Sequence, residues 1–337
     1  MPVTIKRIAP KAAPPSISEW PEGIDAAAFQ CQLAASEIPT AEQVVLPVVA
    51  SFKLDGIRSP ITGGIAKSRK MLSLPNRFMQ GWVKRNQWHL NGLDGEMIVG
   101  PPNLTTTFNT TTSGIMSADG EPDFKFYVFD KWDHGSHSTS VRNAWLRDYF
   151  ESLPTEVRSR LVLVEQRIIY TLDELRAYYD LALELGYEGL ILRKLSAPYK
   201  FGRSTILEGV ALKWKEFIDY TCVVVSVKQG MKNNNEKVRD ELGRAKRSTA
   251  KAGKVPVEEV GGFVVECIEK ESVYFGMQFN CGPGPLTQNQ LKQLWLERES
   301  VPGRKLRVKS QKLGGKTLHR FPGFYGWLHD MNLGVAA

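Results

Sequence analysis

The most reactive pattern in this chain is a short segment, residues 53–58, with the sequence KLDGIR. It follows the apolar run 44–50, which is typical of a buried strand. Alternate side chains of an extended chain share a face, so Lys53 and Asp55 point the same way, and Gly56 allows the backbone to turn. A lysine becomes a nucleophile when partial burial or neighbouring positive charge, here from Arg58 or a bound metal, favours loss of its proton. The alternative is a surface hairpin with a solvated lysine and aspartate.

Further charged groups lie beside apolar, strand-like runs. They are Asp94-Gly95-Glu96, Phe126–Asp130, Glu188-Gly189-Leu190 and Lys213-Trp214-Lys215. A single charge at a strand end is ordinary, but charges beside successive strands indicate strand ends that converge on one cleft. Tyr127 and Phe129 share a face by the strand period of two, so either ring could stack on a base. The alternative for each residue is a strand cap or a core position.

This cleft would contain a lysine nucleophile, carboxylates and additional cations. Glu188, with Glu96 nearby, would hold a divalent metal, while Arg58, Lys213 and Lys215 would add positive charge. Mg²⁺ takes few protein carboxylates together with phosphate oxygens, and cations neutralise charge at a reacting phosphorus. The cleft therefore predicts a nucleoside triphosphate as substrate. Neither G-x-x-x-x-G-K-[ST] nor G-x-G-x-x-G occurs in the sequence, so P-loop and Rossmann sites lack support.

The elements that position these residues follow from the periodic patterns. Residues 1–43 are rich in Pro and Ala and predict an extended lead-in with one short helix near 24–35. We expect strands at 44–54, 64–67, 97–99, 124–129, 189–193 and 209–215, and helices at 77–86, 140–152 and 171–185. Short strands at 221–227, 262–268, 272–280 and 305–310 then predict a small barrel. Residues 229–256 have little apolar content and predict a long mobile loop or a marginal helix.

Bulk properties narrow the class of protein. A chain of 337 residues is long enough for two domains. The net charge is +8, and residues 217–337 carry most of the excess, with 19 Lys and Arg against 12 Asp and Glu. A basic module of this kind suits a polyanionic partner, although a merely soluble basic surface has the same composition. The sequence shows no signal peptide, no membrane-spanning run and no C-x-x-C pair, so we expect a cytoplasmic protein, in the host cytoplasm if viral, with reduced thiols.

The ordered motifs resemble those of the covalent nucleotidyltransferase superfamily, and within it the ATP-dependent DNA ligases, particularly the compact bacteriophage type. The resemblance implies an α+β fold. Residues 44–216 would form an adenylation domain of ATP-grasp-like antiparallel sheets with helices, after an N-terminal extension at 1–43. Residues 217–337 would form a small OB-fold β-barrel with a basic loop at 229–256. A monomer of this family would use ATP and nicked double-stranded DNA, would bind no membrane, and would need Mg²⁺, or Mn²⁺ in its place.

The resemblance also assigns roles within the adenylation domain. Lys53 would form the lysyl–AMP phosphoramidate, and Asp55 would steady it or contact the nick. Around the nucleotide, Arg58 would make a contact, Glu96 would touch the ribose, and Tyr127 or Phe129 would stack on adenine. Arg69 of the Ser68-Arg69 element would bind the nick 5′-phosphate, Glu188 would bind metal together with Glu96, and Lys213 and Lys215 would assist phosphate transfer. These roles predict three successive phosphoryl transfers in one cleft.

The second domain would supply most of the DNA surface. The expected phosphate contacts are Lys237, Arg239, Arg244, Lys246, Arg247, Lys251 and Lys254 in the loop, and Arg320, which begins a segment similar to R-x-P-x-F. Such residues would add sequence-independent affinity, and the alternative is a solvated run of charge.

Two departures and two rival functions remain at this point. Ser51 stands where many cellular ligases have a glutamate, so backbone groups would recognise adenine, and the R-x-D-K element is missing near 327–330. An RNA ligase or a capping guanylyltransferase would share the lysine motif and differ in substrate or base. A non-catalytic OB-fold DNA-binding protein would be basic without needing Lys53.

Overall fold

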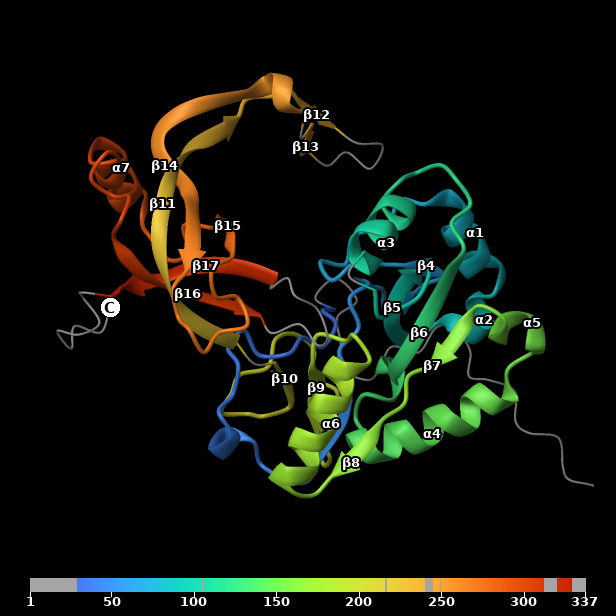
Figure 1. Cartoon of the computed structure of the whole chain (residues 1–337). Coiled ribbons are helices and arrows are strands. Elements are labelled where there is room, and N and C mark those ends of the chain that lie inside the picture. Colours follow the sequence, from blue (N-terminus) through green and yellow to red (C-terminus); the bar gives the residue numbers. More distant parts are fainter. Residues whose placement is uncertain are drawn as a thin grey trace, which may run out of the picture. The chain divides into compact units, whose positions relative to one another are not determined.

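The computed structural model describes residues 29–104, 106–215, 217–239, 245–248, 250–311 and 320–328, with the backbone alone at 237–239, 245–246 and 320–321 (Figure 1). Within these residues the chain divides into two compact units. The first takes its residues from Met1–Leu175 and Leu190–Lys213, and the second from Arg176–Gly189 and Trp214–Ala337. No helix in the described ranges is both long and apolar enough to cross a membrane.

One sheet of the first unit has the strand order β10-β9-β1-β8. Its strands are β1 (Val48–Phe52), β8 (Arg167–Ile169), β9 (Leu190–Lys194) and β10 (Ala211–Trp214). β1 runs antiparallel to both β8 and β9. Its first four residues are buried, which explains the continuous apolar run in the sequence, because a central strand covered on both faces needs no polar side. The chain leaves this strand directly into Lys53.

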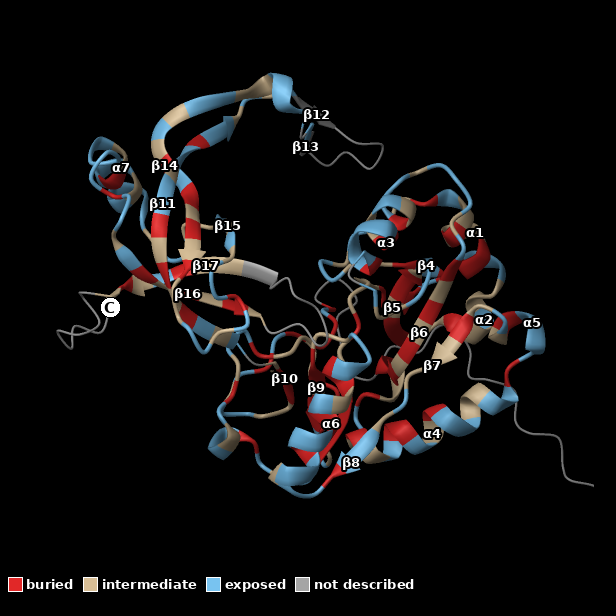
Figure 2. Cartoon of the chain, viewed as in Figure 1, coloured by how far each residue is buried: buried red, intermediate tan, exposed pale blue. Residues whose placement is uncertain are grey.

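The other four-stranded sheet of this unit has the order β2-β5-β6-β7. Its strands are β2 (Ile57–Arg58), β5 (Leu93–Val99), β6 (Phe124–Lys131) and β7 (Leu161–Leu163). Burial alternates along β6, where Phe124, Phe126 and Val128 are buried (Figure 2) and the residues between them are less so. The period of two therefore places Phe129 on the face of β6 that points away from this core.

Helices complete the first unit and cover this core. They are α1 (Arg77–Arg85), α2 (Gln87–Leu90), α3 (Thr107–Ile115), α4 (Thr139–Ser152) and α5 (Thr155–Arg158), with α6 (Leu172–Glu184) crossing into the second unit and short 3₁₀ turns η1 (Ala41–Gln43) and η2 (Trp132–His134). A small hairpin joins β3 (Ile61–Thr62) to β4 (Ile65–Ala66). Asn76 caps α1 by accepting a hydrogen bond from Met79 N at 2.8 Å. Met79 and Trp82 of α1 and Leu146 of α4 join the core beneath β6.

The second unit is built on a five-stranded sheet of order β15-β14-β11-β16-β17. Its described elements are β11 (Phe217–Asn233), β12 (Lys237–Arg239), β13 (Ala245–Arg247), η3 (Lys251–Gly253), β14 (Lys254–Cys267), β15 (Gln278–Cys281), α7 (Gln288–Leu296), β16 (Lys305–Gln311) and β17 (Arg320–Trp327). A bridge between Gly282 and Gly323 joins the end of β15 to β17, so the two edge strands meet as in a partly open barrel. The mixed α and β architecture predicted from the sequence is confirmed.

Three local expectations were wrong. Residues 29–35 form no helix: Leu33 bridges to Arg203 in an extended conformation, and residues 24–28 lie outside the described part of the chain. The described part of residues 229–256 is mostly paired strand and not a long loop or an α-helix, because β11 and β14 stay paired from Cys222 opposite Cys267 to Asn233 opposite Lys254, and β12 pairs with β13 (Figure 1). The predicted strand at 272–280 begins only at 278. A two-stranded arm beyond the sheet has no apolar face to bury, so its polar sequence resembled a loop.

Candidate active site

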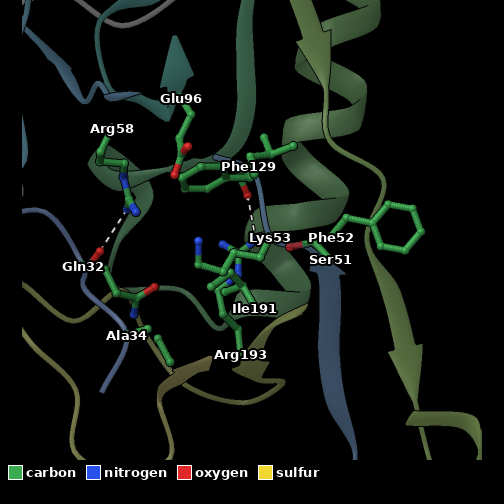
Figure 3. Close-up of a pocket in the computed structure, with 12 residues that line it drawn as sticks. Gln32, Ala34, Ser51, Phe52, Lys53, Arg58, Glu96, Phe129, Ile191 and Arg193 are labelled. Atoms are coloured by element: carbon green, nitrogen blue, oxygen red, sulfur yellow. Dashed lines mark hydrogen bonds between the residues drawn. The ribbon is translucent and has the colours of Figure 1, made fainter. Parts of the chain in front are cut away.

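A single cavity in the first unit collects most of the predicted nucleotide-binding residues (Figure 3). Its lining consists of Gln32, Ala34, Ser51, Phe52, Lys53, Leu54, Arg58, Glu96, Phe129, Ile191, Arg193 and Ala211. Its volume is about 570 Å³, counting the solvent-open space at its mouth. The cavity opens to solvent and places cationic, acidic and aromatic side chains around one space.

Lys53 enters this cavity from the end of β1 and is half-buried. Burial lowers the pKa of Lys213, and the positive charges of Arg203 and Lys53 lower it further. The effect of Lys53 means that the two lysines are near enough to repel each other. The structure thus gives Lys53 a second cation as neighbour, although Lys213 does not itself line the cavity.

Glu96 lies across the cavity from β1, on β5. Its Oε2 accepts a hydrogen bond from the Gly56 N–H at 2.8 Å, and β2 pairs with β5 so that Arg58 is opposite Glu96. Burial raises the pKa of the Glu96 carboxyl, against the opposing charges of Lys53 and Arg58 and the hydrogen bond from Gly56. A side chain at Gly56 would lie 2.6 Å from the Met97 carbonyl oxygen, so only glycine fits this close approach.

Arg58 is held in a closed ring of hydrogen bonds. Its Nε and Nη2 donate to the two oxygens of the buried Asp94 at 2.7 and 2.6 Å, and Nη2 also donates to the Gln32 carbonyl at 2.9 Å. The Tyr199 hydroxyl donates to Asp94 and accepts from the Gln32 N–H at 2.9 Å. Burial alone would lower the pKa of Arg58, but Asp94 raises it well above its ordinary value. The guanidinium is therefore a fixed positive charge, 4.5 Å from the centroid of the Phe129 ring.

Gln32 presents an amide to the cavity. The residue is only 5% exposed, and both of its backbone groups are used in the ring with Arg58 and Tyr199. Its side-chain amide makes no hydrogen bond to any residue in the described ranges, while the residue lines the cavity wall (Figure 3). An amide that faces the cavity has both a donor and an acceptor to offer to a ligand with a matching polar edge.

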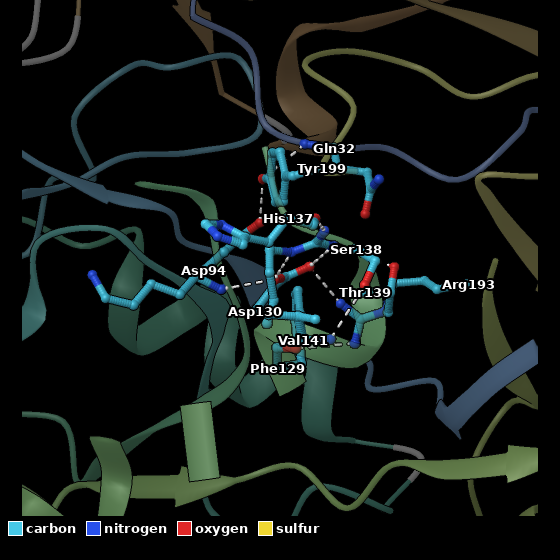
Figure 4. Close-up of polar contacts among 12 residues, drawn as sticks. Gln32, Asp94, Phe129, Asp130, His137, Ser138, Thr139, Val141, Arg193 and Tyr199 are labelled. Atoms are coloured by element: carbon cyan, nitrogen blue, oxygen red, sulfur yellow. Dashed lines mark hydrogen bonds and ion pairs between the residues drawn. The ribbon is translucent and has the colours of Figure 1, made fainter. Parts of the chain in front are cut away.

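A second buried ion cluster fixes the backbone of Phe129 (Figure 4). Arg142 Nε donates to Asp130 Oδ1 at 2.8 Å, and Arg193 Nη1 donates to Asp130 Oδ2 at 2.6 Å. Arg193 Nη2 also donates to the Phe129 carbonyl at 3.0 Å. Burial alone would raise the pKa of Asp130, but Arg193 and Arg142 bring it below its ordinary value. Phe129 therefore cannot shift without breaking a buried charge network.

Other predicted nucleotide and metal residues lie outside this lining. Tyr127 shares a face with Phe129 but does not line the cavity, and Asp55 lies near enough to Glu96 for its charge to contribute to raising the pKa of that carboxyl. Glu188 and Lys215 belong to the second unit, where the Lys215 ammonium lies 5.4 Å from the Phe217 ring centroid. In the described parts of both units, no three His, Cys, Asp or Glu side chains gather as a metal site.

The predicted DNA contacts lie on exposed segments where they are described. Arg69 is exposed in a tight turn of the first unit. Arg247 and Lys251 are exposed on the arm and Lys254 is half-buried, while the Arg247 guanidinium donates to the Asn233 carbonyl. Lys237, Arg239, Lys246 and Arg320 are described by their backbone alone, and Arg244 lies outside the described residues.

Sequence reasoning missed several residues of the site. Ile191 and Arg193 line the cavity, and their spacing of two after Gly189 on a strand was a signal that one face of β9 carries them. Asp94 was part of a noted motif without a role of its own. Gln32 and Tyr199 gave no signal, because their positions depend on contacts between segments 167 residues apart.

Comparisons with known proteins point to the family that the sequence motifs resemble. Residues 35–207 match the family model described as the ATP dependent DNA ligase domain. A structure of Chlorella virus DNA ligase-adenylate is 27% identical, with 90% of this chain and 99% of that chain covered and a TM-score of 0.51. A structure from work on Lig E DNA ligases shares the fold at 21% identity, covering 88% of this chain and 98% of that chain with a TM-score of 0.57. A search of curated protein sequences gave no significant match.

Proposed function

The chain belongs to the ATP-dependent DNA ligase family, and from that premise we propose that it seals nicks in duplex DNA through a lysyl–AMP intermediate on Lys53. One observation carries the proposal: Lys53, Arg58, Glu96 and Phe129, drawn from three separate sequence motifs, line one cavity of the first unit. The substrate would be a 3′-hydroxyl and a 5′-phosphate meeting at a nick. Such sealing would serve DNA replication, repair and recombination.

In the first step the neutral amine of Lys53 attacks the α-phosphorus of ATP. The new N–P bond forms as the bond to pyrophosphate breaks, and the amine loses a proton. Phe129 would stack on adenine, Glu96 would accept from the ribose, and Arg58 would contact the nucleotide with its remaining nitrogen. These groups are already fixed by buried partners, so little reorganisation is needed when charge develops at phosphorus.

In the second and third steps AMP passes to DNA and then leaves. An oxygen of the nick 5′-phosphate attacks the phosphorus of lysyl–AMP, the P–N bond breaks, and Lys53 regains a proton. The 3′-hydroxyl then attacks the 5′-phosphorus, losing its proton as AMP departs. We assign Arg69 to the 5′-phosphate, Asp55 to the nick, and Lys213 and Lys215 to charge neutralisation during transfer. Each step is an in-line displacement that depends on positioning.

The metal assignment follows from the same chemistry. Glu188 and Glu96 would hold Mg²⁺, or Mn²⁺ in its place, together with phosphate oxygens of the substrate. Two carboxylates suit this ion, because Mg²⁺ takes few protein carboxylates and completes its coordination with phosphate oxygens and water. The bound ion would neutralise negative charge at the reacting phosphate.

The basic arm of the second unit provides the proposed non-specific DNA contacts. The exposed or half-buried cations Lys251 and Lys254 lie where β14 begins, and Arg247 ends β13. Lysines and arginines that bind phosphates release counterions, which makes affinity fall with salt. We assign the remaining predicted cations of this arm and Arg320 to the same role.

Labelling of the protein tests the proposal directly. The protein is incubated with ATP or GTP labelled at the α-phosphate, then denatured and examined for covalent label. Label from ATP that is lost in Lys53→Ala and kept in Lys84→Ala, a change at an exposed lysine outside the cavity, is the expected result. Label from GTP alone would indicate a capping-type enzyme and contradict the ligase proposal.

Nick sealing separates the remaining alternatives. With a nicked duplex and ATP, the unmodified protein should join the strands, and NAD should not replace ATP. Joining of RNA strands but not DNA strands would favour an RNA ligase. Failure to join either, with unchanged binding of DNA by Lys53→Ala, would favour a non-catalytic DNA-binding protein.

A further inference from the structure

The turn that carries Arg69 has an unusual backbone. Ser68 and Leu72 close it, with the Met71 N–H donating to the Ser68 carbonyl at 2.7 Å and the Ser68 N–H donating to the Leu72 carbonyl at 2.7 Å. Met71 has φ +60°, the one positive value among the described residues other than glycine. Three-residue hairpin loops usually place glycine at this left-handed position, because a side chain there is strained. A methionine at this position therefore needs a compensating interaction.

That interaction is packing against an aromatic cluster. Phe29, Trp132 and Tyr199 are 3–5% exposed, and Met71 packs against them together with Phe201. The rings of Phe29 and Trp132 lie 4.7 Å apart, and those of Tyr199 and Phe201 lie 5.1 Å apart. Flexible methionine fills irregular gaps and makes favourable contacts with aromatic rings. A glycine would relieve the backbone and lose this anchor.

The same cluster connects the turn to the nucleotide cavity. Tyr199 packs in the cluster through its ring and donates through its hydroxyl to Asp94, which pairs with Arg58. The Cys31 thiol donates to the Arg69 carbonyl at 3.9 Å, next to Gln32 of the hydrogen-bonded ring. Burial raises the pKa of Cys31 to about 11, so its hydrogen is retained near neutral pH. The Arg69 carbonyl and the Met71 side chain are thus tied to residues next to, or packed with, groups that support the cavity.

We propose that Met71 is a positioning residue for transfer of AMP to DNA: it anchors the turn so that the exposed Arg69 is held toward the nick 5′-phosphate. This inference rests on the proposed function, in which Arg69 binds that phosphate. Self-adenylation does not use the 5′-phosphate, so Met71 should matter in the second step and not in the first. A residue needed only for folding would affect both steps alike.

Two rates measured on the same proteins test this inference. The first is formation of lysyl–AMP from ATP, and the second is single-turnover transfer of AMP from the purified lysyl–AMP protein to a nicked duplex. Met71→Ala and Met71→Gly should keep the first rate and lose about tenfold or more in the second, since small misplacements of a substrate-binding group have large kinetic costs. Met71→Leu should restore packing and most of the rate. Leu72→Ala, at an exposed neighbour, is the matched control and should change neither rate.

Different outcomes would contradict the role of Met71 and the proposed ligase function. A wild-type transfer rate in Met71→Gly would mean that only the turn conformation matters, and equal losses in both steps would mean a general structural role; either result overturns the inference. Met71→Ala should add nothing to the loss caused by Arg69→Ala, whereas additive losses would show that Met71 acts elsewhere. If the unmodified lysyl–AMP protein transfers no AMP to DNA, the proposed function itself fails.

Discussion

Replacing Gln32 by alanine should weaken use of ATP without disturbing the surrounding structure. The ring that includes Arg58 and Tyr199 uses only the backbone N–H and C=O of Gln32, and both remain in the variant. The change therefore removes one amide from the cavity lining and little else. A net hydrogen bond contributes about 0.5–1.5 kcal/mol, so loss of one or two such bonds corresponds to about 0.5–3 kcal/mol. We expect kcat/KM for lysyl–AMP formation to fall by about 2- to 150-fold.

The assay compares nucleotides as well as proteins. A glutamine amide can pair in two places with the N6 and N7 edge of adenine, so the loss in Gln32→Ala should shrink when purine riboside triphosphate, which lacks the 6-amino group, replaces ATP. With 2′-deoxy-ATP the loss should remain as large as with ATP. Initial rates of covalent labelling over a range of nucleotide concentrations supply kcat and KM for each pair.

A neighbouring glutamine provides the control for the Gln32 variant. Gln30→Ala removes an exposed glutamine two residues away and should leave all rates unchanged. An unchanged kcat/KM for ATP in Gln32→Ala would refute the argument that the Gln32 amide contacts the nucleotide. A loss that persists with purine riboside triphosphate and vanishes with 2′-deoxy-ATP would place the amide at the ribose and refute reading of the base.

Further predictions concern stability and DNA binding. Asp130→Asn should lower the free energy of unfolding by about 3–5 kcal/mol at pH 7, because Arg142 and Arg193 lose their buried counterion; urea unfolding measures this. The folded-state pKa of Asp130 is depressed, so the stability that its charge contributes is complete above the unfolded pKa of about 3.9 and is lost as the pH falls through the folded pKa. A difference in unfolding free energy between the two proteins that widened in acid would contradict the assignment. Replacing Lys251 and Lys254 together by glutamine should reduce the slope of log affinity against log salt by about 2, and an unchanged slope in a nicked-DNA titration would remove both residues from the DNA surface.

The proposed nucleophile Lys53 and the motif residues that line the cavity with it could be predicted because their signals are local. An apolar run followed by a lysine and a glycine defines the end of β1, and both features act over a few residues. The period of two along β6 placed Tyr127 and Phe129 on one face. The period alone could not say which of the two rings lines the cavity. That depends on Arg193, which bonds to the Phe129 carbonyl, and on the strand that carries Arg193.

The rest of the site was hidden because it depends on contacts distant in sequence. Residues 29–35 have no strand-like alternation, yet Leu33 and Ala35 are fixed by backbone hydrogen bonds to Gly202 and Ala211. A single edge segment can be ordered in this way without any hydrophobic period of its own. The family match begins at residue 35, so Gln32 lies before the part of the chain that pattern recognition covers.

Two buried aspartates, neither of which lines the cavity, explain how its cations are held. Asp94 fixes Arg58 and Asp130 fixes Arg193, and the two guanidinium groups lie 4.5 and 5.6 Å from the Phe129 ring centroid. Buried ion pairs contribute little net stability compared with apolar packing, because desolvation offsets their attraction. Their value here lies in orientation, since an arginine that is already oriented needs no rearrangement as charge develops on a substrate. The same argument applies to Met71, whose strained backbone costs stability while its packing fixes the turn of Arg69.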